Sequence, residues 1–364
     1  MQQLVGIQVL RGIAALSVVL YHATGLVAKS GYEPLFGFFQ IGSRGVQLFF
    51  ALSGFIIYYA HYHDIGRPAR FGRYLYRRFT RIYPTLWVVW VVSAVGYAAG
   101  YHPEKAFKLA VPNLIKSFFV YPLPPDHYIV NASWTLTWEM AFYLVFSVMV
   151  LNRRIGLAAM LLWEAAVVFA NVLQPELPQD LSVLLDPNVF FFLPGMGAAW
   201  LFLNRGRFSW LRNVAVAKLL VAVGAFAFIF EVLIHIGYEN PDFRISGPLD
   251  IVWLCSFYLA PCLVVLGTAI WEVEGSLKPR RIWLTLGAAS YSIYLVHDQQ
   301  LGIMTSLLRP WPAILGTDAT YLAICAIAVA IGIVFYQLVE KPLIRFFAEL
   351  GGHRRAVKPA AAAE

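Results

Sequence analysis

Charged residues are scarce in this chain, at 13% of 364 positions, and it has only three cysteines. With 60% hydrophobic residues, so little charge excludes an ordinary soluble protein, which could not bury that much apolar surface. The cysteines (Cys255, Cys262 and Cys325) fall in apolar stretches without metal-ligand spacing, so we interpret them as packing residues. No internal repeat is visible, which argues against a transporter built from inverted repeats.

Stretches of about 20 apolar residues recur along the chain and predict an all-α polytopic membrane protein with about ten transmembrane helices. The first stretch has no small-residue cleavage site, so we do not expect a signal peptide. The expected spans are roughly 5–27, 44–62, 82–100, 132–151, 155–173, 188–203, 214–236, 249–271, 283–308 and 318–339.

The distribution of lysine and arginine predicts the orientation of these spans. With the N-terminus inside, the cytoplasmic linkers and the C-terminal tail hold 20 of the 28 basic residues, and the outer loops hold seven. Arg11, within the first span, completes the count. The positive-inside rule therefore places both termini in the cytoplasm, and the net positive charge needs no nucleic-acid partner.

No segment outside the spans is long enough to form a separate catalytic domain. The outer segment 101–131 is rich in proline, and we expect at most a short interfacial helix there, near Phe107–Phe119. We assign residues 1–347 to one transmembrane domain and residues 348–364 to a basic, disordered cytoplasmic tail. Any chemistry must therefore occur within the membrane bundle.

Arg11 and His22 share one face of the first span. At about 100° per residue, eleven steps return a side chain to within about 20° of its starting direction, and separate the two by roughly 16 Å. Ionisable groups inside a span usually face a bundle interior or a water-filled cavity. A cation in the inner half and a base in the outer half indicate a long polar molecule threaded into the membrane.

Glu139 and His297 lie in the outer halves of their spans and, with His22, suggest a layer of proton-transfer groups at similar depth. Each has a structural alternative: either histidine could hydrogen-bond a backbone carbonyl, and Glu139 could pair with a buried arginine or orient His22. Glu231 and His235 form another pair one helical turn apart, for which we favour a structural role.

The densest basic patch comes before the third span, and consists of Arg67, Arg70, Arg73, Arg77, Arg78 and Arg81. Topology control and anionic lipid explain this charge as well as a phosphate site does. In the second span, Gly54 suggests close helix approach, with Ser53 able to hydrogen-bond within the bundle.

Five segments of the chain, taken together and in their order along it, resemble the motifs of the acyltransferase 3 family of bacterial integral-membrane acyltransferases. The resemblance covers about Leu4 to Phe346. The five segments are Leu10–His22, Phe49–Phe55, Arg77–Pro84, Ser133–Glu139 and Ser290–His297.

The resemblance implies a multi-pass protein of the bacterial inner membrane that moves an acyl group, usually acetyl, from cytoplasmic acyl-CoA. The acceptor would be a hydroxyl on an exopolysaccharide, a lipopolysaccharide or a lipid-linked sugar, as in exopolysaccharide-type O-acetyltransferases. Acetyl-CoA is thus the expected co-substrate, and no metal is expected because the histidines lack ligand spacing. The chain would transfer the group itself or work with partners of polysaccharide biosynthesis or export.

Together with the geometry of the first span, the resemblance suggests roles for nine residues. The donor-binding set is Arg11, Arg77, Arg78, Arg81 and Ser53, with the arginines near the cytoplasmic face holding the CoA phosphates.

The catalytic set is His22, Glu139, His297 and Tyr291. His22 would act as general base or as a transient acyl carrier. Glu139 would fix the tautomer of His22 or hold the acceptor, and His297 or Tyr291 would donate to the oxyanion.

Two other classes of function compete with this hypothesis. A transporter or flippase for a glycolipid or small anion would also need intramembrane Arg, His and Glu. A non-catalytic scaffold of a polysaccharide export machine would tolerate loss of His22. A measurement of acetyl transfer from acetyl-CoA distinguishes the enzyme from the transporter and from the scaffold.

Overall fold

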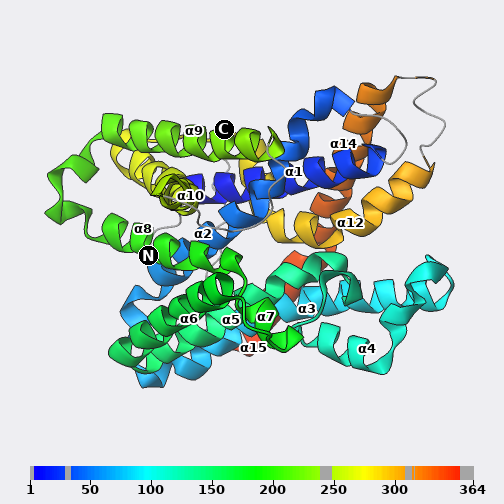
Figure 1. Cartoon of the computed structure of the whole chain (residues 1–364), viewed down its shortest axis with the longest axis horizontal. Helices are drawn as coiled ribbons and strands as arrows, with labels where there is room; N and C mark the ends of the chain where they lie inside the picture. The colour runs from blue at the N-terminus through cyan, green and yellow to red at the C-terminus, as the bar shows by residue number, and fades with distance from the viewer. Residues whose placement is uncertain (1–3, 29–33, 238–247, 308–313, 315, 353–364) are drawn as a thin grey trace.

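The computed structural model describes residues 4–28, 34–237, 248–307, 314 and 316–352, and these residues are all helical wherever they are regular (Figure 1). Side chains of 231–237, 248–256 and 306 are outside the described set, which includes those of Glu231, His235 and Cys255. The long helices are α1 (Val5–Ala28), α2 (Gly45–His61), α3 (Phe71–Ala98), α5 (Trp134–Leu151), α6 (Arg153–Leu173), α8 (Phe192–Leu203), α9 (Val214–Gly237), α10 (Pro248–Gly275), α12 (Ser290–Leu307) and α14 (Thr317–Phe335).

Shorter elements connect or extend these helices. They include α4 (Val111–Phe118), α7 (Gln179–Leu184), α11 (Arg281–Ala288) and α15 (Lys341–Leu350), and the 3₁₀ helices η1 (Pro34–Arg44), η4 (Pro103–Leu109), η6 (Asn131–Ser133) and η7 (Pro187–Phe191).

Eight helical segments among the described residues are long and apolar enough to cross a membrane, which confirms an all-α polytopic protein. The other two expected spans correspond to α9, whose described apolar part ends at Phe230, and to α12, which carries His297 and Asp298. The cytoplasmic location of the termini stays a prediction.

Two expected boundaries differ from the structure. The basic segment before the third span is not a linker, because α3 already begins at Phe71 and makes it helical. The expected tail also begins too early, since α15 continues to Leu350; residues 353–364 lie outside the described set. A helical basic segment has a direct consequence for the site, because its arginines gather on one side.

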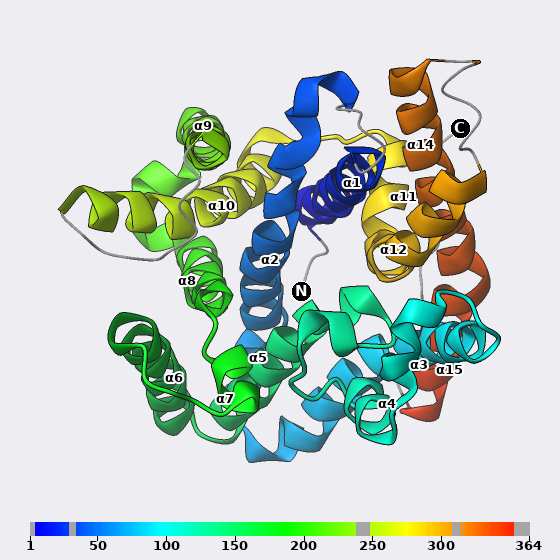
Figure 2. The ribbon, with the colours of Figure 1, turned by 45° about the vertical axis from the view of Figure 1, so that its right-hand side comes forward.

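Helices α1 and α2 lie at the centre of the bundle (Figure 2). The α8–α10 group packs on one side of them, and α11, α12 and α14 pack on the other. Helices α3, α5 and α6 complete the bundle, with α15 against α3. The first span thus contacts elements from both ends of the chain.

Helix α2 crosses α8 closely because both contribute a glycine at the crossing. A Cβ atom on Gly54 would meet the carbonyl oxygen of Phe192 at 2.2 Å, and one on Gly195 would meet that of Ala51 at 2.3 Å. The expected close approach at Gly54 is therefore confirmed, and small residues allow it as in other membrane helices.

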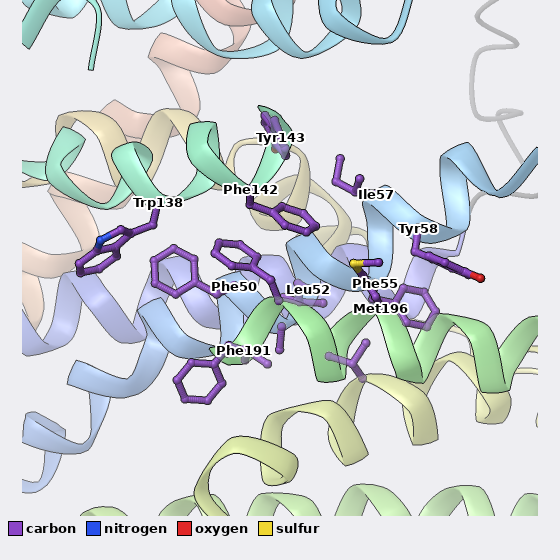
Figure 3. Packing of buried hydrophobic residues seen from close by; sticks show 14 of the residues in the cluster. Phe50, Leu52, Phe55, Ile57, Tyr58, Trp138, Phe142, Tyr143, Phe191 and Met196 are labelled. Atoms are coloured by element: carbon purple, nitrogen blue, oxygen red, sulfur yellow. The ribbon is translucent and has the colours of Figure 1, made fainter. Parts of the chain in front are cut away.

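Aromatic side chains fill the space between α2, α5 and α8 (Figure 3). Phe142 stacks on Phe192 with ring centroids 4.4 Å apart, and Phe50 contacts both Phe192 and Trp138. Phe142 and Phe192 are fully buried. Dense packing of this kind fixes α2 and α5 relative to each other, and these two helices line the inner cavity described below.

The segment between α3 and α5 folds over one end of the bundle. It contains η4 and α4, with a break at Ala110, so the expected helix near Phe107–Phe119 is present in two pieces. Tyr128, Ile129 and Val130 are fully buried, so this loop packs into the bundle rather than lying on its surface.

Candidate active site

A cavity of about 120 Å³, which we call the inner cavity, lies between α1, α2, α3, α5 and α12. Its polar lining residues are Arg11, Ser53, Arg78, Arg81, Thr135, Glu139, Tyr143, Tyr291 and Tyr294. Apolar side chains of α2, such as Phe49, cover much of the remaining wall. Three cations and one carboxylate therefore face a common space inside the bundle.

Glu139 is held within the inner cavity by neighbouring hydroxyl groups. The Ser53 hydroxyl donates to Glu139 Oε1 at 3.2 Å, and the Tyr143 hydroxyl donates to the same oxygen. The Arg78 guanidinium lies over the Tyr143 ring, 5.7 Å from its centroid. These contacts satisfy the carboxylate locally, so Glu139 does not hydrogen-bond to His22.

Arg81 is positioned by Glu340, a residue that the sequence analysis did not single out. Glu340 ends the single π-helical turn Tyr336–Glu340 between α14 and α15, is fully buried, and pairs with Arg81. The backbone N–H and the hydroxyl of Ser292 donate to its other oxygen at 3.1 and 2.5 Å. An acidic residue at the end of a predicted span was the available signal for this site.

Tyr291 belongs to the same group and not to the surroundings of His22. Its hydroxyl donates to the carbonyl oxygen of Ile82 at 3.0 Å, and its ring lies 5.4 Å from Arg81. Tyr291 therefore lines the inner cavity, and its expected role as an oxyanion donor stays a prediction.

A second cavity of about 630 Å³, the basic cavity, adjoins the inner one. Arg73, Arg77, Arg78 and Arg81 line it together with residues of α15, and Arg78 and Arg81 also line the inner cavity. Three of these arginines recur every four residues, so the helical start of α3 presents them on one side. The two cavities therefore meet at a pair of arginines.

A third cavity of about 470 Å³, the outer cavity, lies under the segment between α3 and α5. His22, His297 and Asp298 line it, with Trp134 and Asn131 from the beginning of α5 and η6, and with the loop residues Glu104, Lys105, Lys108 and Asp126. The His22 and His297 rings lie 5.0 Å apart between centroids.

The hydrogen bonding of His297 fixes its tautomer. Its Nδ1 hydrogen-bonds to the carbonyl oxygen of Tyr294, which can only accept, so Nδ1 carries the hydrogen. Nε2 is buried and has no hydrogen-bond partner among the described residues. In its neutral form His297 therefore offers a lone pair at Nε2, and its expected role as an oxyanion donor, which requires a protonated ring, stays a prediction.

Lys108 supports this side of the outer cavity and was missed by the sequence analysis, where it was one basic loop residue among seven. Its side chain is buried and donates to the Tyr128 carbonyl oxygen at 2.7 Å and to Asn131 Oδ1. The Asn131 amide donates to Asp298 at 2.5 Å. Burial lowers the pKa of Lys108 to about 8, a shift that Asp298 partly opposes.

The predicted layer of three titratable groups is only partly present. His22 and His297 face the outer cavity together, whereas Glu139 faces the inner one. Counting from the expected span end at Ala132 did not show this, because Ala132 and Ser133 of η6 are already buried beneath the loop where α5 begins. Arg11 and His22 thus lie on one helix but face different cavities: Arg11 faces the inner cavity and His22 the outer cavity.

Comparisons with known proteins show the family of this chain. The family model described as an acyltransferase domain matches residues 4–337. The exopolysaccharide production protein ExoZ of Rhizobium meliloti is 30% identical, covering 90% of this chain and 95% of its own. Acyltransferase MdmB of Streptomyces mycarofaciens is 25% identical, covering 88% and 84%, respectively.

The peptidoglycan O-acetyltransferase OatA of Listeria monocytogenes is 24% identical over 86% of this chain and 52% of its own length. No solved structure matches. The family match covers more than nine-tenths of the chain, including both α1 residues and the late histidine. The chain is therefore a multi-pass membrane acyltransferase and belongs to the acyltransferase 3 family.

Proposed function

We propose that this protein transfers an acetyl group from acetyl-CoA, entering from the cytoplasmic side, to a glycan hydroxyl in the outer cavity. One observation carries the proposal: three cavities follow each other through the bundle, with arginines lining the first two and two histidines lining the third. Such a series suits a long anionic donor whose reactive end must reach a base.

The donor would bind through its phosphates in the basic cavity. Arginine forms charge-assisted and often bidentate bonds to phosphate, and Arg73, Arg77 and Arg78 provide three guanidinium groups on one helix. Arg81, held by Glu340, lines both the basic cavity and the inner one. Lipid binding alone would not require arginines that also line an interior cavity.

The pantetheine arm would then follow the inner cavity past Arg11 and Ser53. Eleven residues of α1 span about 16 Å between Arg11 and His22, which an extended arm of this kind can bridge. The polar wall of Glu139, Ser53 and Tyr143 offers partners for the amide groups of the arm.

In the outer cavity, His22 would remove the proton of the acceptor hydroxyl. The hydroxyl oxygen then attacks the thioester carbonyl carbon, the carbon–sulfur bond breaks, and the thiolate leaves and takes up a proton. His297 is suited to share the proton because its Nε2 is unprotonated and its ring lies beside that of His22. Whether acetyl passes directly or through an acetyl-histidine is decided by quenching the enzyme with labelled acetyl-CoA in the absence of acceptor.

We infer a sugar acceptor from the chemistry of the outer cavity and from the relatives. Trp134 offers a face for a sugar ring, and Glu104, Asp126 and Asp298 offer hydrogen-bond acceptors for its hydroxyls. The names of ExoZ and OatA favour an exopolysaccharide or another cell-envelope glycan. The protein would then act in the bacterial inner membrane, alone or with partners of polysaccharide synthesis or export.

The test is transfer of labelled acetyl from acetyl-CoA to a glycan fraction by purified protein in liposomes. We expect His22→Ala to abolish transfer and Arg11→Ala to weaken it, with normal insertion of both variants. His63→Ala and Arg154→Ala, at exposed positions outside the three cavities, are the matched controls and should retain transfer.

Equal transfer by the wild type and His22→Ala would refute the assignment of the base. Binding of acetyl-CoA without transfer would be consistent with an acetyltransferase and would exclude the glycan offered as its acceptor. If the wild type neither binds nor transfers acetyl, the acetyl-CoA proposal fails, and movement of a glycolipid or anion becomes the activity to measure.

A further inference from the structure

A small apolar cluster, which we call the partition, separates the inner cavity from the outer one. Val46 and Tyr294 line both cavities. Val18 and Ala132 pack with Tyr294 as a separate buried cluster, and Phe49 packs against it. Val18 is 1% exposed, which leaves no room for water beside it. The partition thus lies between Arg11 and His22, where the donor must pass.

Tyr294 closes the partition through a hydrogen bond between two helices. Its hydroxyl lies 2.7 Å from Thr135 Oγ1, which links α12 to α5, and its ring packs edge-on against Phe49 with centroids 5.7 Å apart. Val46 of α2 and Val18 of α1 complete the contact, so four helices meet at this phenol. Tyr294 is thus the hydrogen-bonded member of the partition, and its side chain lines both cavities.

The same residue also holds a histidine of the site. The Tyr294 carbonyl oxygen accepts the hydrogen bond from His297 Nδ1, and the two rings lie 5.5 Å apart. Tyr294, the member of the partition from α12, and His297 therefore belong to one helical turn. A ligand that moves His297 in the outer cavity acts directly on the residue that closes the passage.

We propose that Tyr294 is a positioning and specificity-determining residue that keeps the donor thioester away from water until an acceptor occupies the outer cavity. This inference rests on the proposed function of the same site. An acyltransferase must favour a sugar hydroxyl over water at about 55 M, and closing the donor cavity provides that preference. The hydrogen bond to Thr135 keeps the closed state dominant.

An open partition has a chemical signature. Water then attacks the carbonyl carbon of acetyl-CoA, the carbon–sulfur bond breaks, and acetate and free CoA thiol are released with the loss of one proton to solvent. This hydrolysis needs no acceptor and is measured as free thiol. It is a gain of activity, which a merely damaged protein would not show.

The experiment compares acceptor-free hydrolysis of acetyl-CoA by the wild type, Tyr294→Phe, Thr135→Val and Tyr294→Ala in liposomes. Loss of one hydrogen bond shifts an equilibrium about fivefold, so we expect hydrolysis by Tyr294→Phe and Thr135→Val to rise about fivefold. Tyr294→Ala, which also removes the ring, should hydrolyse faster still and lose its preference for transfer. If Tyr294→Ala fails to fold, Tyr294→Phe still tests the bond by itself, whereas Thr135→Val keeps the shape of the side chain but also loses the hydrogen bond that Thr135 donates to the Ala132 carbonyl oxygen at 3.2 Å.

Tyr321→Phe is the matched control, because Tyr321 is also buried and its hydroxyl also ties two helices, donating to the Leu20 carbonyl oxygen at 3.0 Å. Its hydrolysis rate should equal that of the wild type. Unchanged hydrolysis in Tyr294→Phe and Thr135→Val, beside a wild type that transfers acetyl, would overturn the role of Tyr294 alone. A wild type that neither binds acetyl-CoA nor transfers acetyl would instead refute the proposed function.

Discussion

Replacing Glu340 with glutamine tests how much a buried ion pair stabilises this bundle. Glu340 is fully buried and pairs with Arg81, which is 27% exposed. Glutamine keeps the shape of the side chain and an oxygen for Ser292, but it removes the negative charge. The guanidinium then stays in the bundle without its counter-ion.

Removing one partner of a buried ion pair costs about 3–5 kcal/mol because the remaining charge is uncompensated. We expect the lower value, about 3 kcal/mol, since Arg81 is partly exposed and the hydrogen bonds of Ser292 persist. With the unfolding entropy typical of a chain this long, this loss lowers the melting temperature by about 4 °C.

The assay is thermal unfolding of the detergent-purified protein, with Glu274→Gln as the matched control. Glu274 pairs with Arg205 at 3.2 Å near the surface, where both side chains are partly exposed. Such a pair contributes less than about 1 kcal/mol, so the control should melt within about 1 °C of the wild type. If Glu340→Gln has the same melting temperature as Glu274→Gln, the ion pair between Arg81 and Glu340 does not stabilise the fold and the reasoning is wrong.

Three further changes have expected outcomes. Gly54→Ala should prevent correct assembly, seen as loss of monodisperse protein, because its Cβ would meet the Phe192 carbonyl oxygen at 2.2 Å; Gly197→Ala, with nothing within 4 Å, should behave as wild type. Phe142→Ala should lower the free energy of unfolding by about 3–5 kcal/mol, measured by denaturant, and an unchanged midpoint would contradict the packing described. The pKa of Lys108 is about 8, so its charge is present below pH 8 and is lost above it. Transfer by the wild type should fall as pH rises through about 8, whereas Lys108→Arg should keep its activity to higher pH because arginine stays protonated; coincident profiles would refute a role for this charge.

The sequence predicted the membrane-spanning helices well because each span is determined by the hydrophobicity of its own residues. Runs of apolar residues define spans wherever they are long enough, and the structure places helices at all ten expected positions. The spacing of Arg11 and His22 also predicted their common helix face, since both belong to one regular helix.

The site was predicted less completely, because it depends on how separate helices meet. Glu139 and His22 seemed equal in depth when counted from their own span ends, but α5 begins below the loop that covers it. Lys108 resembled any other loop lysine until Asn131 and Asp298 were placed beside it.

The sequence by itself therefore determined the spans, the family and the residue types at the site, since these depend on local composition and order. Only the tertiary structure decided which groups share a cavity. It placed Glu139 in the inner cavity with Arg11, fixed the tautomer of His297, and placed Tyr294 in the lining of both the inner and the outer cavity. The physical reason is that these relations come from packing between distant helices, which spacing along one helix does not encode.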